Sequence, residues 1–492
     1  MVQIDTETQN QFSNSDKMAP SDIEKKDIEL AKKLSDSDSQ LDDGSIKEKS
    51  LTWPQASFLL LLEYIVIALL ALPSSWATLG YGGGTIATII LGIVAGYTQH
   101  VLWRFCLKFP EVRDILDVAV ILAGGGTFTL HLKVVFLSNV IIGKWGRIAW
   151  FCAFVGLVLN NVAIMGLHVV QFSVSVNTLS EGAKCTQVFA VCGTLLMFIL
   201  SLMRELKQMS LMGAIASSTM LLCIVLAMIF AGVQGLPANH SGGPIILKPW
   251  DEEGGVEGLI AGNNAALNIA YTYIGHILIP SFVADMKNPK DFDKAIYVSI
   301  IAEIILFSLA GGIIYSQIGA TDMTSPAYGS LQPHFKKAIA AFVLPTVVIV
   351  GGVYCLVTAK TVFARVFDFN SVHRRSHTVK GWSAWIGIIT VLWILAYIIG
   401  QAIPFFNDLI SLISSLFDSW FGFIFWGVGY FFIYRGKSFS RWGIVEGPLN
   451  ILMIIAGFVL LGLGTYTSVE SIRESYASGS IKSPFSCVNN GY

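Results

Sequence analysis

The chain has 492 residues, of which 54% are hydrophobic and 13% charged, and its mean hydropathy is +0.64. This composition excludes a water-soluble globule of such length, so lipid must be the solvent for much of the chain. The formal net charge of −1 supplies no basic field and no nucleic-acid-binding motif occurs, so we expect the lipid bilayer as a partner and no nucleic acid.

The first fifty residues differ from the rest of the chain. Residues 1–50 are polar and rich in Ser, Asp, Glu and Lys, and therefore cannot bury enough apolar surface to fold alone. They also lack the basic start and apolar stretch of a cleaved signal peptide. We predict a disordered tail that lies in the cytoplasm, because the first spanning helix itself directs insertion.

Eleven apolar stretches are long enough to cross a bilayer, for which a helix needs roughly 20 residues. They cover residues 56–79, 85–102, 148–174, 186–203, 209–233, 259–283, 295–316, 338–357, 382–400, 409–434 and 445–465. This pattern predicts an all-α polytopic membrane domain over residues 51–467 and a short outer tail at 468–492. The segment 114–133 contains three consecutive glycines and is predicted as a cytoplasmic loop with a short interfacial helix.

Charged loops predict which way these helices point. With the N-terminus inside, about 19 Lys and Arg residues fall in cytoplasmic loops and about six outside, as the positive-inside rule expects. The only glycosylation acceptor pattern, Asn239-His240-Ser241, falls in a long loop on the predicted outer side, so Asn239 is the candidate glycosylation site. The odd number of spans places the C-terminus outside as well.

The seven cysteines show no metal-ligand spacing, so we expect no metal site and no cofactor. Cys185 and Cys487 both fall on the predicted outer side, where the environment is oxidising. A disulfide between them is one option, which no distance supports from the sequence alone.

Two predicted spans carry interruptions. In the first, Pro73 removes a backbone donor, which breaks a helix or, alternatively, only kinks it. In the sixth, residues 271–276 (Tyr-Thr-Tyr-Ile-Gly-His) place a glycine and a histidine in mid-membrane, ahead of Pro280. The two spans correspond if the first ten form two inverted five-helix repeats with the eleventh appended, which is the LeuT-like architecture.

Several motifs, in order along the chain, resemble those of a known family. They are Leu70-Ala71-Leu72-Pro73, Phe109-Pro110-Glu111-Val112 with Asp117, Met165-Gly166-Leu167-His168, Ala266-Leu267-Asn268-Ile269, Lys287-Asn288-Pro289-Lys290-Asp291-Phe292 and Ala402-Ile403-Pro404-Phe405-Phe406. From about residue 53 to residue 464 the chain resembles the amino acid/auxin permease family, in particular its fungal neutral amino-acid permeases. It departs at Val66 and Ala68, where the family's signature has glycines, so the first span must open without glycine's conformational freedom.

The resemblance implies import of amino acids by proton symport, with sodium as the alternative coupling ion and the plasma or, alternatively, a vacuolar membrane as the location. Backbone N–H groups near Ile67, Ala68 and Leu69 would hold the substrate carboxylate, and carbonyls between residues 271 and 274 its ammonium. The candidate substrate-binding residues are Val66, Ile67, Ala68, Leu69, Asn161, Tyr271, Tyr273, Ile274 and Gly275. Plain packing is the alternative for the two tyrosines, and a hydrogen bond between helices is the alternative for Asn161.

Ionisable residues inside a bilayer are costly and therefore mark candidate functional sites. Glu63, one helical turn before the first interruption, and His276 in the sixth span are the candidates for proton coupling. A hydrogen-bonded structural carboxyl and a neutral imidazole that caps backbone groups are the alternatives. His168, Glu303 and Asp418 are interpreted as structural, with pairing to a neighbouring group as one option for Glu303.

Two other classes of function remain as alternatives. An amino-acid sensor or receptor with little or no transport is the main one, and uptake of labelled substrate separates it from a transporter. An enzyme ranks last because no nucleophile–base pair, metal cluster or phosphate loop occurs at suitable spacing.

Overall fold

The structure is a computed structural model that describes residues 51–123, 144–203, 206–250, 254–367, 371–375, 378–435, 443–478 and 484–491. The tail predicted at 1–50 lies outside this part of the chain, as does residue 124 onward of the loop predicted at 114–133. In the described residues the regular elements are helices, with one isolated β-bridge between Leu51 and Met286. The all-α prediction is therefore confirmed.

Nine helical segments of the described chain are long and apolar enough to cross a bilayer. They lie in α4 (Leu72–Lys108), α7 (Lys144–Ser180), α9 (Leu206–Val233), α10 to α11 (Gly255–Asp285), α12 (Phe292–Ile318), α13 (Pro333–Val366), α15 (Val379–Ala402), α16 to α17 (Phe406–Ile433) and α18 to α19 (Gly443–Ala477). A tenth apolar helix, α8 (Thr186–Ser201), is shorter. The multi-pass prediction is confirmed, whereas the count of eleven spans stays a prediction.

The surface of α12 shows why lipid is the expected solvent. Ile301, Ile305 and Leu309 follow one another at intervals of four residues and are 57%, 55% and 48% exposed. Residues at this spacing share one face of a helix. An apolar face of this kind is unfavourable in water and favourable in hydrocarbon.

A bend inside α4 lies where the sequence predicts a gap between the first two spans. Gly80 has a φ of 76°, which favours glycine, and a Cβ there would lie 2.6 Å from a backbone atom of the loop after α9. The N–H groups of Tyr81 and Gly82 donate to the carbonyls of Lys248 and Pro249 in that loop, both at 2.8 Å. A segment distant in sequence therefore satisfies the donors that the bend releases.

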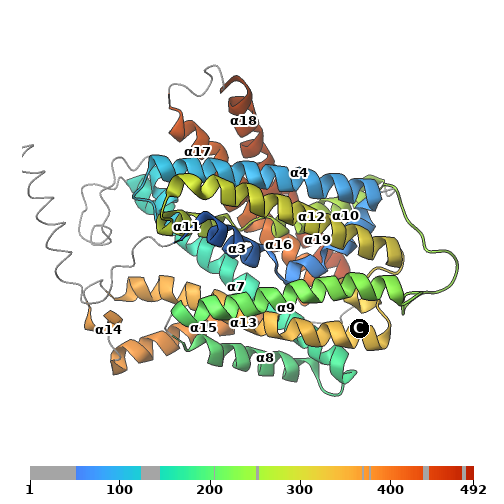
Figure 1. The fold of residues 1–492 in the computed structure, drawn as a ribbon. Coiled ribbons are helices and arrows are strands. Elements are labelled where there is room, and N and C mark those ends of the chain that lie inside the picture. Colours follow the sequence, from blue (N-terminus) through green and yellow to red (C-terminus); the bar gives the residue numbers. More distant parts are fainter. Residues whose placement is uncertain are drawn as a thin grey trace, which may run out of the picture. The chain divides into compact units, whose positions relative to one another are not determined.

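Small residues let the long helices approach one another closely. Figure 1 shows α4 beside α12, and a Cβ added to Gly92 or Gly96 of α4 would lie 2.5 Å from Ile304 or 3.1 Å from Ile300 of α12. Contacts through small residues are the usual way in which helices pack in a membrane. α7 in turn packs against α13 and α15.

Two loops at the predicted outer end are tied together by hydrogen bonds. The carbonyl oxygen of Asp322, between α12 and α13, accepts from Asn239 Nδ2 at 2.8 Å, and its carboxylate Oδ2 lies 2.7 Å from His240 Nδ1. The hydrogen bond to Asp322 raises the pKa of His240. Glycosylation of Asn239 stays a prediction.

The C-terminal segment packs against the ends of α7 and α8. A disulfide joins Cys185 to Cys487. The structure therefore contains the pairing that the sequence suggested as one option. Thr186 Oγ1 donates to the carbonyl of Val488 at 2.6 Å, which holds the same segment in place. α19 (Thr465–Ala477) continues into the stretch predicted as the outer tail.

Candidate functional site

The first predicted interruption is a true break in the helix. α3 (Trp53–Tyr64) ends where Ile65 (φ −84°, ψ 75°) and Val66 (φ −117°, ψ 173°) leave the helical region. A short 3-10 helix, η2 (Ile67–Leu70), follows before α4 begins. The break therefore precedes Pro73, which lies in the first turn of α4, where a helix needs no donor from it.

This break leaves two backbone donors without acceptors. The N–H of Leu69 donates to the carbonyl of Val66 at 3.1 Å, and that of Ala71 donates to Ala68 at 2.9 Å. The N–H groups of Ile67 and Ala68 have no acceptor among the described residues. All four residues of η2 are buried in the protein interior, so bulk solvent does not reach these two donors. Two of the three predicted donors are thus available to a carboxylate, and the N–H of Leu69 is already used.

The second interruption is also a break. α10 (Gly255–Thr272) ends before Tyr273, and the chain resumes as η3 (His276–Leu278) and α11 (Ile279–Asp285). The carbonyl of Tyr271 accepts from the N–H of Ile274 at 3.3 Å. The carbonyls of Tyr273 and Ile274 accept no hydrogen bond from the described residues. Free carbonyl oxygens therefore lie in this break, as the sequence predicts.

The two breaks touch through one aromatic ring. A Cβ added to Gly275 would lie 2.9 Å from Cζ of Tyr64, the last residue of α3. The φ of Gly275 is −118°, so this position needs glycine for space and not for backbone conformation. Gln99 of α4 holds the ring in place, because its Nε2 donates to Tyr64 Oη at 2.9 Å.

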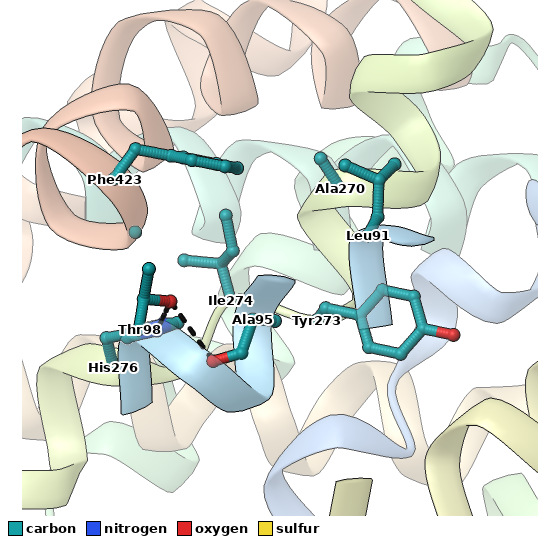
Figure 2. A pocket seen from close by; sticks show the side chains of 9 residues that line it. Leu91, Ala95, Thr98, Ala270, Tyr273, Ile274, His276 and Phe423 are labelled. Atoms are coloured by element: carbon teal, nitrogen blue, oxygen red, sulfur yellow. Dashed lines mark hydrogen bonds between the residues drawn. The ribbon is translucent and has the colours of Figure 1, made fainter. Parts of the chain in front are cut away.

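A hollow beside the second break contains His276. It is too narrow to hold a water molecule and is lined by Leu91, Ala95, Thr98, Ala270, Tyr273, Ile274, His276, Gly422 and Phe423. His276 Nε2 lies 2.8 Å from Thr98 Oγ1, and its ring stacks on Trp426. Figure 2 shows His276 and Thr98 on one side of Ile274 and the ring of Tyr273 on the other.

The predicted residues Glu63 and Asn161 both reach α13. Tyr354 Oη of α13 donates to Glu63 Oε1 at 3.3 Å. Asn161 Nδ2 of α7 donates to Thr358 Oγ1 at 2.9 Å, which makes it a bridge between α7 and α13. Tyr271 lies close enough to Glu63 to interact with it electrostatically. Glu63 therefore lies beside both α13 and Tyr271 of the second break, while Asn161 joins α7 to α13.

One carboxyl that the sequence interpretation treated as structural has no partner. Glu303 of α12 is fully buried, and neither of its carboxyl oxygens has a hydrogen-bond partner in the described chain. Tyr64 and Tyr273, one at each break, lie close enough to interact with it electrostatically. The only signal in the sequence was a charge inside the apolar stretch 295–316.

Most of the chain matches one family of known proteins. The family model described as "Transmembrane amino acid transporter protein" matches residues 49–470. The chain belongs to this family. This confirms the predicted resemblance to the amino acid/auxin permeases.

Two similar proteins and one solved structure extend the comparison. The chain is 29% identical over 465 residues to the N amino acid transport system protein of Neurospora crassa, covering 92% of each chain. It is 26% identical over 454 residues to a transmembrane transporter of Gibberella moniliformis, covering 90% and 89%. An inward-facing structure of Mhp1 is 14% identical and has a TM-score of 0.50. The match covers 87% of this chain and 92% of the Mhp1 chain. The LeuT-like fold is thereby confirmed.

Proposed function

We propose that this amino acid transporter imports neutral amino acids together with protons by alternating access. One observation carries the proposal: unpaired N–H groups at Ile67 and Ala68 and unpaired carbonyls at Tyr273 and Ile274 lie in two breaks that touch. An amino acid presents a carboxylate that needs donors and an ammonium that needs acceptors. Broken helices at the bilayer midplane supply both without a charged side chain.

The preference for a neutral substrate follows from the residues of the first break. Val66 and all of η2 are apolar, so a charged substrate side chain would lose its hydration there without gaining a partner. The relative in Neurospora crassa is described as an amino acid transport protein, which supports the substrate class.

We place the protein in the plasma membrane, with a vacuolar membrane as the alternative, the N-terminus inside and the C-terminus outside. The disulfide between Cys185 and Cys487 supports this orientation, because such bonds persist in oxidising compartments. Asn239 lies at the same predicted outer end.

Uptake of radiolabelled neutral amino acids into cells without their own permeases, with the external pH varied, tests the proposal. We expect saturable accumulation that rises as the medium is acidified. Glu63→Gln should weaken this pH-driven uptake at normal surface expression, because the carboxyl next to the breaks loses its charge, and His276→Ala should impair transport. Binding without accumulation would identify a sensor and contradict the proposal.

A further inference from the structure

Glu303 lies in an environment that does not suit a charge. The side chain is in the middle of a membrane-spanning helix, is 0% exposed, and has no hydrogen-bond partner for either oxygen in the described residues. An ionised carboxylate in such a place is strongly unfavourable unless it is paired. The buried, unpartnered position therefore requires the neutral, protonated form of Glu303.

The surroundings of Glu303 connect it to both breaks. Among the described residues, Tyr64 and Tyr273 are the titratable side chains that interact with it electrostatically. Tyr64 covers Gly275 and is hydrogen-bonded to Gln99, whereas the hydroxyl of Tyr273 is buried without a partner. A movement of either break therefore changes the cavity around this carboxyl.

The other titratable groups on helices packed against α12 face different partners. His100 of α4 interacts with Arg104 and with Asp293 at the start of α12, and Arg104 interacts with Tyr434 and Glu446. Glu63 of α3 interacts with Tyr354, and Cys223 of α9 interacts with Tyr328. None of them supplies a positive charge that could pair with Glu303. The negative charge of the Glu303 carboxylate must therefore be neutralised by a ligand that binds to this carboxylate.

We propose that Glu303, rather than Glu63 or His276, is the binding site for the coupled proton. The inference rests on the proposed proton symport and adds the residue that carries the proton through the closed state. When the breaks open to the outside, the hydrated carboxylate takes a proton from water; after closure and opening to the inside, the carboxyl returns that proton to water. One proton is bound and one released in each cycle.

A proton fits this site better than a metal cation. Hard cations require several oxygen ligands at once, whereas a proton requires a single carboxyl oxygen. Within the described chain, no group of three His, Cys, Asp or Glu side chains is placed to hold a metal ion. The two phenols near Glu303 are poor substitutes for additional carboxylates.

The experiment compares wild type and Glu303→Gln in proteoliposomes, with substrate exchange and proton flux measured in parallel. Glutamine has the shape of the protonated glutamic acid but cannot release a proton. We expect exchange of labelled for unlabelled amino acid to persist and to become independent of pH, while substrate-driven proton flux falls at least tenfold. Ser299→Ala, one turn away on α12, is the matched control and should leave both readouts unchanged.

The outcomes separate this inference from the proposed function. If wild type carries amino acids without proton flux, the proposed symport fails; if wild type and Glu303→Gln show the same proton flux, only the assignment of Glu303 fails. If Glu303→Gln loses amino-acid exchange as well, the Glu303→Asp variant is used to test the assignment. A shifted pH profile of coupled uptake in that variant supports the assignment, and an unchanged profile overturns it.

Discussion

The two breaks at the candidate site open the backbone in different ways. The first contains no glycine: Ile65 and Val66 leave the helix in conformations with negative φ, and Val66 is extended. β-branched residues adopt such conformations readily. The second break contains Gly275, but its φ of −118° is also open to other residues, and glycine is required there by the ring of Tyr64. In both breaks, therefore, unwinding does not depend on the conformational freedom of glycine.

This comparison explains the departure from the family's signature. Val66 and Ala68 replace glycines, yet the backbone around them opens and leaves the N–H groups of Ile67 and Ala68 unpaired. The side chains of Val66 and Ala68 reduce the space beside these donors, because this part of the chain is buried. The departure thus bears on the size of the site and not on whether the helix breaks.

The largest effect is expected from filling the contact between the breaks. In Gly275→Leu the new side chain would overlap the ring of Tyr64, whose position Gln99 fixes. We expect kcat/KM for uptake to fall roughly a hundredfold, near the upper end of what overpacking costs. The measurement is initial uptake rate corrected for the amount of protein at the cell surface.

Two further variants test whether the effect comes from this contact. Gly387→Leu on α15 is the matched control, because nothing lies within 4 Å of a Cβ at that position. Tyr64→Ala combined with Gly275→Leu should recover part of the lost activity. A fully active Gly275→Leu variant would show that the two breaks do not need this close contact.

The sequence predicts the helices well because the bilayer leaves few other choices. An apolar stretch such as 295–316 or 338–357 must be helical to satisfy its backbone in lipid, and α12 and α13 contain these stretches. The bend at Gly80 could not be predicted in this way. Its released donors are satisfied by Lys248 and Pro249, which no local pattern connects to it.

For the site, the sequence indicates which spans are interrupted but not how the interruptions meet. Pro73 marks the first span, yet the break lies earlier because proline fits the first turn of α4. The contact of Tyr64 with Gly275 joins positions far apart in the chain, and periodicity carries no information about it. The isolation of Glu303 has the same cause: the absence of a partner is a property of packing.

A smaller effect is expected from removing one donor of the first break. Ile67→Pro deletes the N–H proposed to bind the substrate carboxylate, and proline is tolerated because Ile67 begins η2 and Val66 is already extended. A hydrogen bond to a charged group contributes about 1.5–3 kcal/mol, so KM should rise at least about tenfold. Concentration-dependent uptake measures this change.

Ile67→Val is the control for this prediction, because it trims the side chain and keeps the donor. Its KM should stay close to that of the wild type. An Ile67→Pro variant with normal surface expression and normal KM would mean that the substrate carboxylate binds elsewhere, and the first break would then lose its proposed role.

The smallest effect is expected from restoring the family's glycine in Val66→Gly. Because Val66 already adopts its extended conformation without strain, glycine adds only freedom to the unfolded chain, and the loss of stability should be roughly 0.5–1 kcal/mol with less than about a twofold change in uptake. Thermal unfolding of the purified protein and initial uptake rates measure the two quantities. A severalfold gain in transport would show that the first break moves during transport through backbone conformations that valine resists, and its opening would then depend on glycine's conformational freedom after all.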